Sequence, residues 1–324
     1  MNIAMSRFKT SLQRELWEHR GGFVYTPLII GGVLLLFLIM GAGSSFFWQF
    51  KIDGAEAMTE GALKLAEANA QPEQLKLGVD AFLWVTAILW QAVLFIVLFF
   101  YFVGSLYDDR KDRSVLFWKS MPVSDLETVI SKLVFGVVIA PLFMVGALIV
   151  GQIVLLLASG VVVMAHGGNA WKLLWAHASP FPVWGQILAV QGVQGLFLLP
   201  LFGWLMLASS FARSKPILWA VLPPVVFAIM ESFIGFTTHF SLSKVIWEFI
   251  LRRVASGFAP VSFSADFGDG QSMQAGLSGT RFATDFSEVL GRLGTADLWI
   301  GVLIGVVFLA GAVYLRRYRD ESTG

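Results

Sequence analysis

A short stretch of the chain combines residue types suited to docking another protein. Residues 108–113 carry six consecutive charges that sum to zero. Large apolar side chains follow them: Val115, Leu116, Phe117, Trp118 and Met121. Apolar groups on so charged a segment need burial, either against the protein's own helix ends or in a groove of a partner, since exposed apolar patches usually mark interfaces. Both interpretations are open from these residues alone.

The same stretch contains a break and a new start. Pro122 blocks helix continuation and restricts Met121 before it. Ser124 and Glu127 have the spacing of a capping box, in which each side chain satisfies a free backbone N–H at a helix start. Residues 107–132 are therefore predicted to form a short helix, a turn at Met121–Pro122 and a second helix.

A second group of candidates consists of polar residues inside long apolar stretches. Gln152 lies in the third such stretch, Gln191 and Gln194 share one helix face in the fourth, and Glu231 lies in the fifth. Polar groups are costly to bury in lipid, which makes them candidates for a substrate route. The alternatives are hydrogen bonds between helices and, for Glu231, contact with water at the outer surface.

Several other kinds of chemistry are excluded or disfavoured by the sequence. There is no Gly-Lys dipeptide, so the GxxxxGK[ST] phosphate loop cannot occur. There is no cysteine, and none of the four histidines has a metal-site spacing such as HExxH. A GxSxG nucleophile elbow is also absent. No catalytic, cofactor or metal site is predicted, and no basic, aromatic face suggests nucleic-acid binding.

Composition places these candidates in a membrane. The 324 residues are 56% hydrophobic and only 14% charged, against about 25% charged in soluble domains. A helix needs about 20 apolar residues to span a bilayer. An all-α membrane protein with one domain, residues 1–324, and six transmembrane helices is predicted. The spans are expected at about 26–48, 81–105, 133–160, 184–210, 217–236 and 297–315.

The N-terminal residues 1–22 are predicted to form an amphipathic helix in the membrane interface. Met5, Phe8, Leu12 and Leu16 recur at intervals of three and four residues, with basic residues off that stripe. A basic amphipathic helix before the first span is typical of an element that lies on the membrane surface.

The distribution of Lys and Arg predicts the orientation. One side would hold residues 1–25, 106–132, 211–216 and 316–324, with 14 basic residues in 67 positions. The opposite loops have 9 in about 115. Both termini and the 106–132 segment are therefore expected in the cytoplasm. Residues 237–296, between spans five and six, are expected to form an extracytoplasmic segment that is partly helical.

The 107–132 segment resembles the cytoplasmic loop of ABC-2-type permeases, the membrane subunits of one class of ATP-binding-cassette transporters. That family has the pattern E-R-x-x-G-T-L-x-x-L-x-x-x-P-V-S followed by a lysine that enters span three. Asp109-Arg110 stands where its Glu-Arg does, Met121-Pro122-Val123-Ser124 matches its Pro-Val-Ser, and Lys132 precedes the third span. Asp112-Arg113 departs from the family's Glu-Gly. The six-span plan with an outer helical segment is also similar.

The resemblance implies a function and partners. The chain would be the permease of an exporter in a bacterial inner membrane, paired with a second permease copy and with ATPase subunits that bind ATP and Mg²⁺. The docking residues would be Asp109, Arg110, Val115, Leu116, Phe117, Trp118, Met121 and Pro122. Membrane lipids are the remaining partner. An ion-coupled secondary transporter is the alternative, and it would rely on an intramembrane charge such as Glu231.

Overall fold

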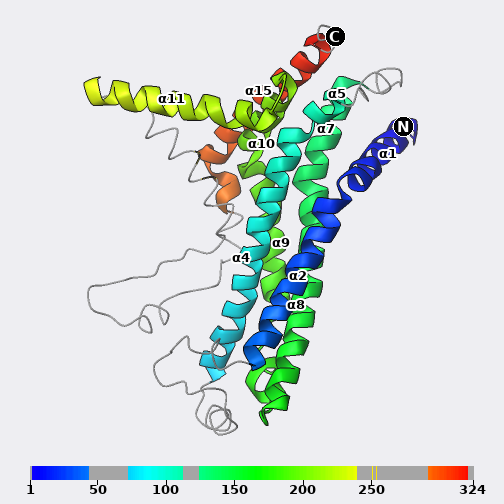
Figure 1. Cartoon of the computed structure of the whole chain (residues 1–324), viewed down its shortest axis with the longest axis vertical. Helices are drawn as coiled ribbons and strands as arrows, with labels where there is room; N and C mark the ends of the chain where they lie inside the picture. The colour runs from blue at the N-terminus through cyan, green and yellow to red at the C-terminus, as the bar shows by residue number, and fades with distance from the viewer. Residues whose placement is uncertain are drawn as a thin grey trace.

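The structure is a computed structural model, and it describes residues 2–43, 72–111, 124–238, 250, 253 and 291–319. Every element within these ranges is a helix. Long helices run side by side along one axis, and they are joined at its two ends (Figure 1). The chain first forms α1 (Asn2–Glu18), then a π-helical turn (Gly21–Tyr25), then α2 (Thr26–Gly43). The predicted N-terminal helix is thus present.

Among the described residues, four helices are long and apolar enough to cross a membrane. They cover Gly21–Met40, Gly78–Lys111, Asp125–Ala165 and Ala296–Tyr318. The second consists of α4 (Pro72–Gly104) with the short α5 (Tyr107–Lys111) after it. The third joins α7 (Asp125–Val134), a π-helical turn (Phe135–Ile139) and α8 (Ala140–Ala165), and the fourth is α15 (Ala296–Arg319).

A fifth span is formed if two bent helices are taken together. After the π-helical turn η3 (Trp171–Trp175), α9 (Pro180–Phe197) and α10 (Leu199–Phe211) meet at an angle of 52°. Pro200 explains the break, because it has no N–H to continue the backbone ladder and its ring clashes with the preceding turn. The ring of Phe202 just beyond the bend stacks on Phe102 of α4 at 4.4 Å, which fixes α10 in the core.

The fifth predicted span, residues 217–236, does not have the length and direction of the other apolar helices, and its apolar part, Pro216–Glu231, is short. The turn before it is present, and Lys215 has a positive φ of 48°. The helix that follows, α11 (Pro216–Thr238), then runs across the long axis of the bundle (Figure 1). The structure therefore supports four or five spans, and a span formed by α11 stays a prediction.

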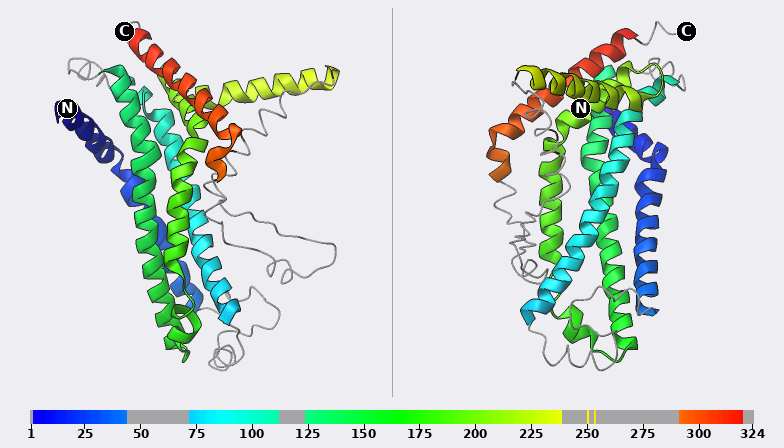
Figure 2. Two further views of the ribbon diagram at one scale, coloured as in Figure 1. Left: turned by 180° about the vertical axis from the view of Figure 1, so that it is seen from behind. Right: turned by 60° about the vertical axis from the view of Figure 1, so that its left-hand side comes forward.

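Several helix ends gather at one end of the bundle. α1, α5, the start of α7, the α10–α11 turn and the C-terminal end of α15 all lie there (Figures 1 and 2), and the side of the membrane that they face stays a prediction. These are the segments that the distribution of basic residues assigned to one side of the membrane. Most of the predicted outer segments, 49–71 and 239–290 except Ile250 and Arg253, lie outside the described residues.

The outer surface of the bundle is apolar. Leu28 on α2, Val150 on α8 and Leu303 on α15 expose 68%, 62% and 69% of their surface. Such side chains would be unfavourable in water over so large an area, and they are expected where lipid surrounds helices whose backbone groups are satisfied internally. The chain is a helical membrane protein.

Candidate functional site

Six charged side chains meet at the end of the bundle where residues 112–123 leave α5 and return to α7. We call them the charged cluster: Arg14, Glu15, Asp109, Asp125, Lys132 and Arg316. They come from α1, α5, α7 and α15. Three are acidic and three are basic, so their formal charges cancel. Cancellation matters because an unpaired ion is expensive to bury.

Asp109 lies at the centre of the charged cluster. Its carboxylate is 3.3 Å from a guanidinium nitrogen of Arg14, 3.3 Å from one of Arg316 and 3.5 Å from Nζ of Lys132. The Asp109 side chain is only 7% exposed. A carboxylate with three cations around it holds together three elements that are distant in sequence.

Glu15 joins α1 to the same group. Its Oε1 is 2.9 Å from Nζ of Lys132, and its Oε2 accepts a hydrogen bond of 2.9 Å from the hydroxyl of Tyr101. The Tyr101 hydroxyl also lies 3.2 Å from the backbone oxygen of Lys132. Glu15 sits on the apolar stripe of α1, three residues after Leu12, so helix periodicity turns this acid inward. Helix α1 is therefore attached to the bundle by charge as well as by the apolar contacts of Leu12 and Leu16.

Arg316 links the two ends of the 112–123 segment. It lies 3.3 Å from Asp109, just before that segment, and 3.1 Å from Asp125, just after it. Ser124 caps α7 by accepting a hydrogen bond of 3.1 Å from the backbone N–H of Glu127, which confirms the predicted helix start. Both ends of the segment are consequently anchored to the last helix.

Arg110 attaches α5 to the end of α10. Its guanidinium donates hydrogen bonds to the backbone oxygens of Ser209 and Ala212, at 2.5 and 3.0 Å. The Ser209 hydroxyl accepts from the N–H groups of Leu106 and Tyr107, at 3.0 and 2.9 Å. These bonds satisfy backbone carbonyl groups at the C-terminal end of α10 and backbone N–H groups at the start of α5. Groups at such helix ends lack hydrogen-bond partners within their own helices.

Burial and nearby charges shift the pKa of Arg14 in the charged cluster and of His19 beside it. Burial lowers the pKa of Arg14, but the hydrogen bond and charge of Glu18, with the charge of Asp109, outweigh burial and raise that pKa overall. Burial lowers the pKa of His19 despite the opposing charge of Glu15. Arg14 thus stays charged.

One group near the cluster has the geometry of metal ligands. Ligand atoms of Glu15, Glu18 and His19 lie within 4.8 Å of one another. Two of the three are already engaged, since Glu15 pairs with Lys132 at 2.9 Å and Glu18 with Arg14 at 2.7 Å. These cations would compete with a metal ion, so the group is better explained as part of the ion-pair network.

Of the predicted docking residues, the structure describes two. Asp109 is buried in the charged cluster and Arg110 is half-buried against α10, so both lie at the base of the segment and not on an open surface. The rest lie outside the described residues: Val115, Leu116, Phe117, Trp118, Met121 and Pro122.

Gln152 is fully buried and hydrogen-bonded. Its Nε2 donates to the backbone oxygen of Leu83 at 2.8 Å and to Oγ1 of Thr86 at 2.9 Å. Its Oε1 accepts from the indole N–H of Trp184 at 2.7 Å. The residue therefore joins α8 to α4 and α9, which is the helix-to-helix alternative to a substrate route.

Gln191 and Gln194 are likewise joined to another helix. Gln91 of α4 accepts from Gln191 and donates to Gln194, each at 2.9 Å. A single amide thus bridges two residues on one face of α9. Gln91 was missed from sequence, although it is a polar residue inside an apolar stretch just as Gln152 is.

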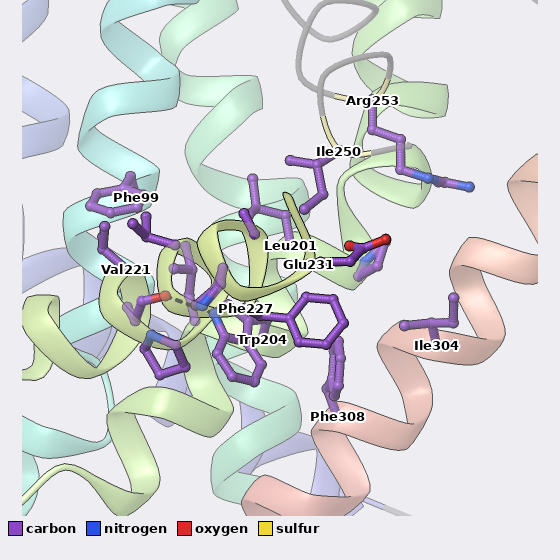
Figure 3. A pocket seen from close by; sticks show the side chains of 17 residues that line it. Phe99, Leu201, Trp204, Val221, Phe227, Glu231, Ile250, Arg253, Ile304 and Phe308 are labelled. Atoms are coloured by element: carbon purple, nitrogen blue, oxygen red, sulfur yellow. Dashed lines mark hydrogen bonds between the residues drawn. The ribbon is translucent and has the colours of Figure 1, made fainter. Parts of the chain in front are cut away.

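Glu231 differs from these glutamines. It is 7% exposed, and neither carboxylate oxygen has a hydrogen-bond partner among the residues that the structure describes. It lines a cavity of about 690 Å³ between α10, α11 and α15 (Figure 3). The four predicted substrate-route residues are therefore not brought together, because Gln152, Gln191 and Gln194 are engaged in helix contacts and do not line this cavity.

Two hydrogen bonds position the walls of this cavity. Pro224 has no N–H, which leaves the backbone oxygen of Ala220 without its helical donor. The indole N–H of Trp204 on α10 takes that place at 2.9 Å, which ties α11 to α10 while α11 continues through both prolines. Arg253 similarly donates to the backbone oxygen of Phe197 at 2.9 Å, at the end of α9, and pairs with Asp297 at 3.3 Å.

The comparisons with known proteins do not define a narrower class for this chain. No protein-family profile, curated protein or solved structure matches the chain. The class that fold and composition define is a helical membrane protein with a charged cluster at one end and a mainly apolar cavity lined by Glu231 and Arg253.

Proposed function

We propose that this chain is the membrane subunit of an ATP-driven exporter of ABC-2 type in a bacterial inner membrane. A separate ATPase subunit docks on residues 112–123, on the cytoplasmic side. The observation that supports this proposal most is the charged cluster, because it holds both ends of that segment through Asp109, Asp125 and Arg316. Ion pairs at Asp109 and Asp125 therefore connect the residues on either side of the segment to α15.

Movement of the segment would reach the spans along fixed contacts. Lys132 belongs to the continuous helix Asp125–Ala165, and Arg316 belongs to α15. The helix α15 packs closely on α10, where a Cβ added at Gly203 would lie 2.8 Å from the backbone oxygen of Gly305. A shift of α15 therefore displaces α10, and these two helices form walls of the Glu231 cavity.

The sequence indicates which part of the transporter each subunit supplies. This chain has no phosphate loop, so ATP and Mg²⁺ bind in the partner subunit. A second permease copy completes the membrane part. The chain itself supplies the docking segment, the buried anchor and the route through the membrane.

Purification from the native membrane tests the proposal. The full-length tagged protein is expected to co-purify with an ABC ATPase, identified by mass spectrometry. A double substitution, Phe117→Asp with Trp118→Asp, should abolish this association while the protein still inserts, since burying two unpaired charges in an apolar groove costs several kcal/mol.

A matched control lies at the opposite end of the bundle. Trp171 and Phe181 are 65% and 79% exposed, and Trp171→Asp with Phe181→Asp removes two aromatic side chains and adds the same charge. This variant should keep the ATPase. If the wild-type protein never associates with an ATPase, or if both double variants lose it equally, the proposal is wrong.

Glu231 is buried and has no hydrogen-bond partner among the described residues. This favours one other function, an ion-coupled transporter in which the Glu231 carboxylate binds the coupling proton. The two are separated by energy source in membrane vesicles. Transport that needs ATP and survives collapse of the proton gradient supports the exporter, and the reverse result supports ion coupling.

A further inference from the structure

The cavity that Glu231 lines is mainly apolar, and both oxygens of the Glu231 carboxylate are buried at its wall. Aromatic side chains from three helices surround it, namely Trp204 of α10, Phe227 of α11 and Phe308 of α15 (Figure 3). The rings of Trp204 and Phe308 pack edge to face at 5.6 Å. A volume of about 690 Å³ falls within the usual range for small-molecule sites, about 300–1,000 Å³.

Burial without a partner makes this carboxylate unusual in the chain. An ionised carboxylate in an apolar setting is strongly unfavourable unless a cation or hydrogen-bond donors compensate it. Glu15 and Asp109, which are equally buried, have such partners within 2.9–3.5 Å. Glu231 has none among the described residues, and a proton or a cation from outside the chain would compensate its charge.

Among the described residues, one other charged side chain lines the cavity. Arg253 also lines it, but its guanidinium pairs with Asp297 at 3.3 Å and caps the Phe197 carbonyl at 2.9 Å. No ion pair within 4.0 Å joins Arg253 to Glu231 in the described part of the chain. Glu231, Arg253 and Asp297 together sum to one negative charge.

We propose that this cavity binds a lipophilic monocation, with its positive centre at the Glu231 carboxylate and its apolar body against Trp204, Phe227 and Phe308. Aromatic faces attract cations through their quadrupoles, and this attraction is stronger where water is excluded. The apolar walls select a hydrophobic body, and the single acid selects the charge.

The cation site deepens the proposed function, and its role as the exported substrate rests on that function. Binding itself does not require an ATPase. A protein that binds the cation but never associates with an ATPase would refute the exporter and leave the site intact. A protein that associates with the ATPase but does not bind the cation would refute only the site.

Binding is measured on the purified full-length protein in a non-ionic detergent. The probe is radiolabelled tetraphenylphosphonium, compared by equilibrium dialysis with tetraphenylborate, which has the same shape and the opposite charge. The wild type should bind the phosphonium at least tenfold more tightly than the borate. Glu231→Gln should weaken phosphonium binding at least tenfold and Glu231→Asp should largely retain it. Glu73→Gln, an exposed acid at the start of α4, should not change it.

A second measurement uses only the wild-type protein, in case Glu231→Gln does not fold. A lipophilic carbodiimide labels buried carboxyl groups, and peptide mass spectrometry should show less labelling of Glu231 when tetraphenylphosphonium is present. Three results would overturn the site: no phosphonium binding, equal binding of the two ions, or unchanged binding by folded Glu231→Gln. Labelling of Glu231 that the phosphonium does not reduce would overturn it as well.

Discussion

The charged cluster and the Glu231 cavity both bury carboxylates, but the two regions differ in the partners that surround the carboxylate. Asp109 is surrounded by three cations at 3.3–3.5 Å, whereas neither oxygen of Glu231 has a hydrogen-bond partner among the described residues. The first arrangement compensates charge within the chain and fixes the relative positions of helices. The second leaves charge uncompensated, which disfavours a purely structural role and favours a ligand.

Removing the central carboxylate of the charged cluster should have the largest effect. Asp109→Asn leaves Arg14, Lys132 and Arg316 with one acid fewer, and breaking a buried ion pair costs about 3–5 kcal/mol. A clear fall in the stability of the detergent-purified protein to chemical denaturation is expected. Asp108→Asn, at the exposed neighbouring position of α5, is the control and should have a much smaller effect. Equal losses would show that the cluster does not stabilise the fold.

Removing one of the hydrogen-bonded glutamines should have an intermediate effect on stability. Gln152→Leu removes bonds to Leu83, Thr86 and Trp184. Buried groups left unsatisfied cost about 1–3 kcal/mol, so this variant should be less stable by about that amount. Phosphonium binding should not change, because Gln152 does not line the cavity. Gln186→Leu, on α9 and outside both glutamine networks, is the matched control; a loss of binding in Gln152→Leu alone would return this residue to the substrate route.

Replacing Glu231 by an apolar residue should change stability in the opposite direction from Asp109→Asn. Glu231→Met replaces a buried acid, which has no hydrogen-bond partner in the described part of the chain, with an apolar side chain of similar length. This should raise the stability of the ligand-free protein by about 1 kcal/mol. The same chemical denaturation series as for Asp109→Asn measures it. A fall in stability would mean that Glu231 has a structural partner, and the contrast between the two regions would fail.

Sequence patterns predicted the regular parts of the fold because those parts follow local rules. Apolar stretches of sufficient length gave the positions of α2, α4, α8 and α15, and the Ser124 cap fixed the start of α7. The break between α9 and α10 was not predicted, although Pro200 is a local signal for it. The direction of α11 depends on how this helix packs against its neighbours, and an apolar stretch carries no such information.

The site was only partly predictable for the same reason. Glu231 and Gln152 were found as polar residues within apolar stretches, but their different surroundings come from helices far away in the sequence. The charged cluster was missed except for Asp109 and the general position of Lys132. Glu15 had a usable signal, since it lies on the apolar face of α1, but its partner Lys132 is 117 residues away.

The smallest expected effect is a change of stability with pH that comes from His19, next to the charged cluster. His19 packs its ring edge to face on Tyr101 at 4.9 Å, with Nε2 3.9 Å from Glu15. Burial lowers its pKa; the charges of Glu15, Glu18 and Asp108 oppose this effect, and that of Lys132 adds to it. The unfolded chain therefore takes up the proton more readily than the folded one. The contribution of His19 to stability is complete above the unfolded pKa of about 6.5, and it is lost as the pH falls through the lower folded value.

Thermal unfolding in detergent between pH 7.5 and pH 5 measures this contribution. The wild type should lose stability on acidification, and His19→Gln should lose less, because glutamine does not titrate. His166→Gln, at the opposite end of the bundle, should keep the wild-type slope. If His19→Gln loses as much stability as the wild type, another group accounts for the pH dependence. If it loses more, His19 stabilises the cluster as a cation, and the cancellation of charge among its six members is incomplete.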